Sequence, residues 1–178
     1  MKSAAELRLA ARHAALQAIY ALDCEEGELE EVLTYALEQE SFPEVLVQYI
    51  TTLVKATAED GKRLDDMIAP LLAQGWRFDR IAKVDRAILR MAAAEFEHIP
   101  QTPPKVTINE SVELAKLFGD QNSAPFINGV LGRLLPLSIK SSYKHEGFDP
   151  MLSEPAERVV ADEDGEEIVE AGSERHEE

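Results

Sequence analysis

The stretch that decides the fold runs from Lys105 to Leu135 and reads KVTINESVELAKLFGDQNSAPFINGVLGRLL. Apolar residues recur in it every three or four positions, first over 108–118 and again over 127–134, which is the spacing of an amphipathic helix. Gly119 is a helix-stop residue between the two runs, and Ser123 is a typical helix cap. The stretch therefore predicts two helices joined by a short polar turn.

Two residues of the second helix lie off its apolar stripe. At about 100° per residue, Phe126 and Arg133 fall about a quarter turn to one side of Ile127, so a ring and a guanidinium share one flank. An exposed ring can stack on an unpaired base, and Arg133 and Asn122 can contact phosphate and base edges. The alternative is that Phe126 belongs to the core and Asn122 only forms the turn.

Helical patterns continue along the rest of the chain, while strand-like alternation and hairpin dipeptides are nearly absent. The pattern predicts an all-α body of about seven helices, ending near residue 138. We expect the first helix over about 4–23 and a long helix opened by a capping box at 41–44. A separate helical segment is expected over 64–72, and residues 81–99 are the best candidate for the core helix.

Several residues of the body have structural explanations. Trp76 precedes an expected helix and is predicted to be a core or hinge anchor. Arg86 and Arg90 lie one turn apart on the core helix, so we expect interhelical ion pairs. Glu110 is explained as the last member of a capping box with Thr107.

Charge is distributed unevenly along the 178 residues. The net charge is −16, but residues 145–178 hold 13 acidic and 2 basic side chains, so −11 falls there and −5 remains for residues 1–144. We therefore predict a domain over 1–140 and an acidic, disordered tail over 141–178. The tail either solubilises the protein or folds over the cations of the first helix and competes with RNA.

Motif content excludes several classes of function. Cys24 is the only cysteine, so no disulfide forms within the chain, which fits a reduced cytoplasmic setting. Charges interrupt the amino-terminal residues, so we expect neither a signal peptide nor a membrane span. The histidines are scattered, and phosphate-binding loops, dinucleotide-binding glycines and a nucleophile elbow are missing. We expect a cytoplasmic binding protein without metal, cofactor or enzymatic activity.

The first helix carries candidate phosphate contacts. Arg8 and Arg12 lie one turn apart, and neither has an acidic residue three or four positions away. Both are therefore predicted to be available to an external anion, and Lys2 adds positive charge near the helix start. The alternative is that the arginines pair with carboxylates of other helices.

Four segments of the body have an order and spacing found in a known family. They are RHAALQAIY at 12–20, VDRAILRMA at 84–92, INESVELAK at 108–116 and FINGVL at 126–131. In these segments the chain resembles the NusB family of transcription antitermination factors, and the resemblance covers the body but not the acidic tail. It implies an all-helical fold of two three-helix-like halves.

The resemblance also implies a function. Family members bind the single-stranded boxA sequence of nascent ribosomal RNA transcripts and act with the ribosomal protein NusE to make RNA polymerase resist termination. Carried over by position, the RNA surface uses two groups of residues: Lys2, Arg8 and Arg12, and then Asn122, Ser123 and Phe126. Asp85 matches a position that grips the ribosomal partner, although the helix dipole also favours a carboxylate there.

The first helix departs from the family in the density of its arginines, because two uncharged residues separate Arg8 from Arg12. We therefore expect weak RNA binding by this chain alone, with a slope of log affinity against log salt of only about −1.5 to −2. This interpretation requires the cations and the ring of Phe126 to lie exposed on one side of the bundle. The competing interpretation is a helical adaptor that binds only proteins.

Overall fold

The structure, a computed structural model, describes residues 2–138, 140, 160–161 and 167–168. Six α-helices and three short 3-10 segments make up the described part of the body. The α-helices are α1 (Ala4–Asp23), α2 (Leu29–Glu38), α3 (Glu44–Ile68), α4 (Lys83–His98), α5 (Pro104–Phe118) and α6 (Ser123–Leu134). The 3-10 segments are η1 (Ala69–Leu71), η2 (Phe78–Arg80) and η3 (Leu135–Leu137). The predicted all-α class is confirmed for the body, with six α-helices where about seven were expected.

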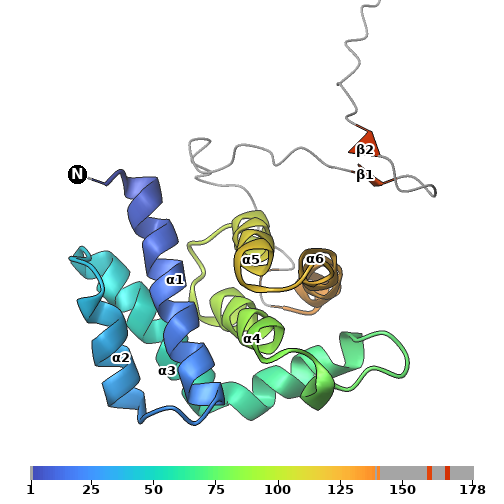
Figure 1. Cartoon of the computed structure of the whole chain (residues 1–178), viewed down its shortest axis with the longest axis horizontal. Helices are drawn as coiled ribbons and strands as arrows, with labels where there is room; N and C mark the ends of the chain where they lie inside the picture. Colours follow the sequence, from blue (N-terminus) through green and yellow to red (C-terminus); the bar gives the residue numbers. More distant parts are fainter. Residues whose placement is uncertain (1, 139, 141–159, 162–166, 169–178) are drawn as a thin grey trace, which may run out of the picture. The chain divides into compact units, whose positions relative to one another are not determined.

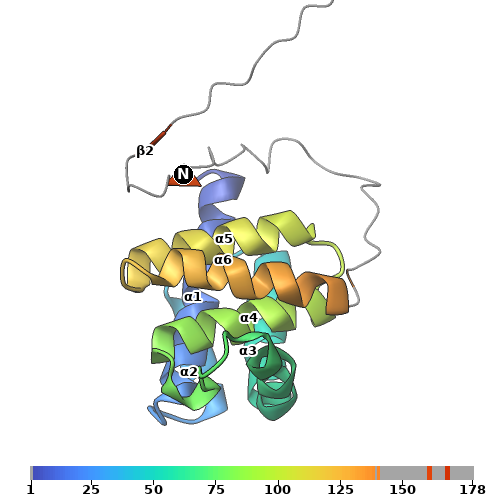
Figure 2. The same cartoon turned by 90° about the vertical axis from the view of Figure 1, so that its right-hand side faces the viewer.

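The helix α4 lies at the centre of the body, as predicted for residues 81–99. It lies between α1, α2 and α3 on one side and α5 and α6 on the other, and α5 and α6 lie side by side (Figures 1 and 2). From Ala87 to Phe96 every α4 residue except Arg90 is buried. Alanines at 92, 93 and 94 leave room for neighbouring helices to approach closely. The two three-helix-like halves therefore share one core.

Helix starts are decided partly by capping and partly by proline. At α1, the Ser3 hydroxyl accepts a hydrogen bond from the Glu6 N–H (3.2 Å) and the Glu6 carboxylate accepts one from the Ser3 N–H (2.6 Å). The capping boxes predicted at 41–44 and 107–110 are wrong. In α3 and α5 a proline precedes the first helical residue and no side chain caps the helix.

The segment predicted over 64–72 is not a separate helix, because α3 continues through Gly61 to Ile68 before η1 begins. A glycine inside a helix costs about 1 kcal/mol relative to alanine. Leu64 and Ile68 are both fully buried, and this burial offsets the cost of Gly61.

The predicted ion pairs of α4 are confirmed. Arg86 Nε donates to Asp23 Oδ2 at 3.0 Å. Arg90 donates to Asp23 Oδ1 and to Asp65 Oδ1, both at 2.6 Å. These bonds join α4 to the end of α1 and to α3.

Most of the predicted tail lies outside the described residues. The four described residues form two short strands, β1 (Val160–Ala161) and β2 (Glu167–Ile168), paired antiparallel with Val160 opposite Ile168. A pair of strands there was not predicted. In the described residues no helix is long and apolar enough to cross a membrane.

Candidate functional site

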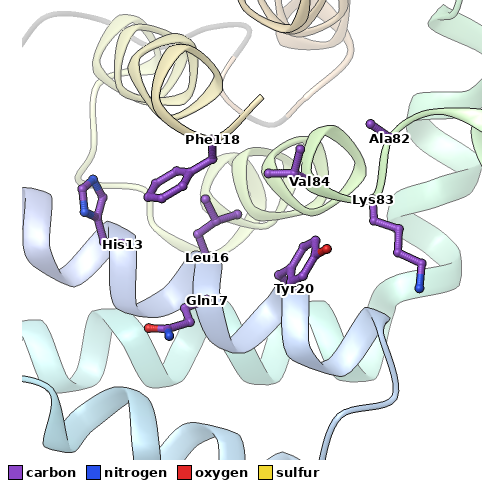
Figure 3. A pocket seen from close by; sticks show the side chains of 8 residues that line it. All are labelled: His13, Leu16, Gln17, Tyr20, Ala82, Lys83, Val84 and Phe118. Carbon is purple, nitrogen blue, oxygen red and sulfur yellow. The ribbon is translucent and has the colours of Figure 1, made fainter. Parts of the chain in front are cut away.

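A groove with a volume of about 650 Å³ opens between α1, the start of α4 and the end of α5 (Figure 3). Rings and aliphatic side chains form most of its wall. The lining residues are His13, Leu16, Gln17, Tyr20, Ala82, Lys83, Val84 and Phe118. Four of them come from α1 at spacings of three and four residues, so they form one stripe along that helix.

Two rings close one end of the groove. His13 and Phe118 meet edge to face, with ring centroids 5.4 Å apart (Figure 3). Burial lowers the pKa of His13, and the Glu110 carboxylate offsets part of that change. Phe118 is 51% exposed, so its predicted place on the apolar stripe of α5 is wrong. The buried positions of α5 include Ser111, Leu114 and Ala115, so Ala115 of the predicted stripe is confirmed in the core, while the inward face is centred slightly earlier in the sequence.

The other end of the groove has a polar rim. Lys83 Nζ donates to Cys24 Sγ at 3.7 Å. Tyr20 is 38% exposed, and a hydrogen bond with Cys24 raises the Tyr20 pKa. The groove therefore combines an apolar floor with hydrogen-bonding groups at one edge.

Asp85 follows Val84 at the start of α4. It is 7% exposed, and its Oδ1 has no hydrogen-bond partner within the described residues. Burial raises the pKa of Asp85, and a hydrogen bond from Ser123 partly offsets the change. A buried oxygen without a donor costs free energy in the folded protein. The residue predicted to bind a partner is thus nearly covered, with one acceptor position unfilled.

The turn between α5 and α6 is tightly built. A Cβ at Gly119 would lie 2.4 Å from the Ser123 side chain, so only glycine fits. The Asp120 carboxylate accepts a hydrogen bond from the Asn122 N–H (2.7 Å), and Ser123 Oγ accepts one from the Asp120 N–H (3.0 Å). Ser123 is 2% exposed and is the first residue of α6, so its predicted roles as a cap and as an RNA contact do not fit its burial. Asn122 is exposed.

The ring of Phe126 is partly buried and stacks on Trp76, with centroids 5.8 Å apart and planes 27° apart. Of the two predicted roles of Trp76, core or hinge anchor, the core placement is wrong, because Trp76 is 59% exposed. Arg133 follows Phe126 by two helical turns on the same side of α6. It is exposed and makes no ion pair with the described residues. The apolar stripe predicted for α6 is confirmed as its buried face.

The three cationic residues predicted to contact RNA phosphates, Lys2, Arg8 and Arg12, have different surroundings. Lys2 is exposed and pairs with Glu40. Arg8 is partly buried and has no ion pair in the part of the chain that the structure describes. Arg12 is 6% exposed, and its Nη2 donates to Glu95 Oε1 at 3.0 Å. The prediction that Arg12 is available to an external anion is therefore wrong.

Arg12 belongs to a buried polar cluster. The Tyr49 hydroxyl donates to the same oxygen, Glu95 Oε1, at 2.9 Å, and the Arg12 guanidinium lies 5.4 Å from the centre of the Tyr49 ring. Burial alone lowers the pKa of Arg12, but Glu95 raises it above the ordinary value, so the arginine stays charged. Burial and the Glu95 carboxylate raise the pKa of Tyr49 well above its ordinary value. The cluster joins α1, α3 and α4.

The cations and the rings do not form one patch. The start of α1 lies at one edge of the body and α6 at another, with α4 and α5 between them (Figure 1). The requirement that both lie on one side of the bundle is therefore not met. Lys2 and Arg8 form one surface, and Trp76, Phe126 and Arg133 form another.

The groove residues and the exposed position of Trp76 were missed by sequence reasoning. His13, Leu16 and Tyr20 have the spacing of a core stripe, so their pattern carries no separate signal. Trp76 stands between glycine and arginine, and this polar context was the available signal of exposure. Within the described residues, no three His, Cys, Asp or Glu side chains are grouped to hold a metal ion.

Comparisons with known proteins agree with this architecture. The NusB family model matches residues 9–136. The transcription antitermination protein NusB of Bacillus pumilus is 43% identical over 128 residues, which cover 71% of this chain and 93% of the relative. The structure of T. maritima NusB has a TM-score of 0.67 at 30% identity and covers 75% of this chain and 92% of its own.

A crystal structure of antitermination factors NusB and NusE in complex with dsRNA shares the fold. Its TM-score is 0.65 at 24% identity, and the match covers 78% of this chain and 98% of that one. The family match, the identity to curated relatives and the shared fold lead to one conclusion. This chain belongs to the NusB family of transcription antitermination proteins.

Proposed function

We propose that this protein binds boxA-type single-stranded RNA in nascent ribosomal RNA transcripts together with the ribosomal protein NusE, and so helps RNA polymerase resist termination. The observation that carries the proposal is a pair of different exposed surfaces near the start of α4. One is the apolar groove, and the other is the stacked ring pair of Trp76 and Phe126. The first suits a protein, and the second suits an unpaired base.

The groove and Asp85 support a protein partner. Tyr20 and Phe118 expose much of their rings in or beside the groove, and a partner that covers them removes apolar area from water. Asp85 is nearly covered and its Oδ1 is buried, so we propose that it serves the partner surface by its position beside Val84 of the groove and not through that oxygen. Residues 1–144 carry a net charge of −5, which favours the encounter with a basic partner.

The second surface supports RNA binding. Asn122 is exposed about one helical turn before Phe126, and Arg133 lies two turns after Phe126. Lys2 and Arg8 add a separate electrostatic contact at the start of α1. We propose that Arg12 and Ser123 serve RNA binding only indirectly, by holding α1 and the α5–α6 turn in place.

The competing function is an adaptor that binds proteins but not RNA. One observation favours it: the burial of Arg12 removes a cation from the surface that would meet phosphate. In either case we propose that the protein acts in the cytoplasm, by binding and not by catalysis.

Labelled boxA RNA tests the proposal in the presence and absence of NusE. We expect weak binding by the protein alone and tighter binding with NusE, while Asp85→Asn weakens the NusE complex. Binding of NusE without RNA binding in either mixture would establish the adaptor function. The matched control is Glu113→Gln, which removes an exposed carboxylate whose only ion pair in the described residues is with Lys116 three positions later.

A further inference from the structure

Trp76 is held in a defined position although it is largely exposed. The backbone N–H of Trp76 donates to the Ala73 carbonyl at 3.0 Å, and Gly75 has φ of +88°. A positive φ at the third position of a four-residue turn is the requirement of a type II turn, and glycine adopts it without strain. The turn therefore fixes the backbone from which the indole projects.

The loop is also anchored just after the tryptophan. Phe78 is partly buried, and the Arg90 guanidinium lies 5.7 Å from the centre of its ring. Arg90 is itself bonded to Asp23 and Asp65. The loop that carries Trp76 is thus attached to the charged cluster of α4, which limits the motion of the indole.

Stacking leaves one face of the indole open. Phe126 covers one face of Trp76, and 59% of Trp76 is still exposed. In this arrangement the tryptophan also covers part of Phe126. The outward surface for a stacking base is therefore the free face of Trp76, with Phe126 supporting it from behind.

Two arginines that follow Trp76 closely in the sequence favour nucleic acid over an apolar peptide as its ligand. Arg77 is exposed and bonded to Asp79 through two hydrogen bonds of 2.9 and 2.8 Å. Arg80 is exposed and has no ion pair among residues 2–138. An exposed ring followed four residues later by an exposed arginine without an ion pair among the described residues suits a base and a phosphate of one strand.

We propose that Trp76 is an RNA-binding residue that stacks on an unpaired base, with Arg80 contacting the adjoining phosphate. This inference rests on the proposed RNA-binding function and adds a residue outside the predicted site. It places the stacked base over the loop before α4, beside α6, and makes Phe126 a positioning residue for the indole.

The sequence offers a direct probe, because Trp76 is the only tryptophan of the chain. Unlabelled boxA RNA and, in a separate titration, NusE are added to the full-length protein at low salt while indole emission is recorded. In parallel, the affinity for labelled boxA RNA is measured with NusE for the wild type, Trp76→Leu and Trp76→Phe. Tyr35→Leu is the matched control, because Tyr35 is an aromatic residue of α2 that is 55% exposed. Circular dichroism and thermal unfolding verify that each variant is folded.

The expected results are quenching of the indole by RNA and at least about five-fold weaker binding by Trp76→Leu. Trp76→Phe keeps a ring and retains most of the affinity, and Tyr35→Leu matches the wild type. RNA binding with unchanged indole emission and an unaffected Trp76→Leu variant would overturn this inference and leave the proposed function standing. Failure of the wild type to bind RNA even with NusE would overturn both. Indole emission that responds to NusE but not to RNA would assign Trp76 to the protein partner and also overturn the inference.

Discussion

Arg12 is buried although arginine is usually exposed, and Trp76 is exposed although tryptophan is usually mostly buried. The arginine is 6% exposed, inside a cluster with Glu95 and Tyr49, and the tryptophan is 59% exposed on a loop. Each is held by a residue distant in sequence: Glu95 holds Arg12, and Phe126 supports Trp76. The exposure of these two side chains thus depends on which residues contact them in the fold. Residue type alone does not predict that the arginine is buried or that the tryptophan is exposed.

The largest effect is expected from removing the buried cation. Arg12→Ala leaves the Glu95 carboxylate buried without its ionic partner, and the free energy of unfolding should fall by about 3–5 kcal/mol. Urea denaturation followed by circular dichroism measures this. Arg8→Ala, one turn away, is the control and should change stability by no more than about 0.5 kcal/mol. Equal losses for the two variants would show that Arg12 is not the structural residue of the pair.

A smaller loss is expected at the link between the charged cluster and the exposed loop. Arg90→Ala removes the bonds to Asp23 and Asp65 and the contact with Phe78. We expect a loss of about 1.5–3 kcal/mol in the free energy of unfolding, because hydrogen bonds between charged groups are removed. The indole emission of Trp76 should also change as its loop loosens. An unchanged emission spectrum would show that the loop does not depend on Arg90.

Acidification should lower the free energy of unfolding through His13 of the groove, by less than the two arginine substitutions do. The pKa of His13 is lowered by burial, so the unfolded chain takes up this proton more readily than the folded one. Stability from neutral His13 is fully present above the ordinary pKa of about 6.5 and is lost as the pH falls below that value and through the lowered pKa of the folded protein. His13→Phe should therefore lose less stability than the wild type between pH 7.5 and 5.5, a window of about one unit on each side of the ordinary pKa, in parallel thermal unfolding curves. Identical losses for the two proteins would contradict the role given to His13.

The smallest effect on stability is expected at the start of α1. Replacing Lys2 and Arg8 with alanine should change the free energy of unfolding by no more than about 0.5 kcal/mol. It should weaken RNA binding and reduce the salt slope by about 0.7 for each phosphate that the variant no longer neutralises. A salt titration of labelled RNA measures the slope. A slope that stays at the wild-type value would remove these cations from the RNA surface.

Local signals in the sequence were sufficient for much of the fold. The bounds of α1, the central position of α4 and the buried stripe of α6 were predicted, because helical periodicity and stop residues act within a few residues. The pairing of Arg86 and Arg90 followed from charges on a helix that had to be buried. Two helix starts were misplaced because a proline near each one set the boundary in place of a capping box.

The candidate site was less accessible to sequence reasoning. Ser123 has the chemistry of an exposed cap, but the close approach of Gly119 buries it. Phe118 completes an apolar stripe, but it lies at the last turn of α5, where it reaches His13 instead of the core. These outcomes depend on how the helices pack against one another, which periodicity along one helix does not contain.

The most direct measurement compares the RNA affinity of variants at the buried arginine and at the exposed tryptophan. In a triple variant, Arg12→Met, Tyr49→Phe and Glu95→Leu replace the buried polar cluster with apolar side chains, a change that often preserves folding. With circular dichroism showing both proteins folded, we predict near wild-type RNA affinity for the triple variant and at least about five-fold weaker binding for Trp76→Leu. Loss of RNA binding in the folded triple variant, with full binding by Trp76→Leu, would contradict the assignment of Arg12 to structure and of Trp76 to RNA.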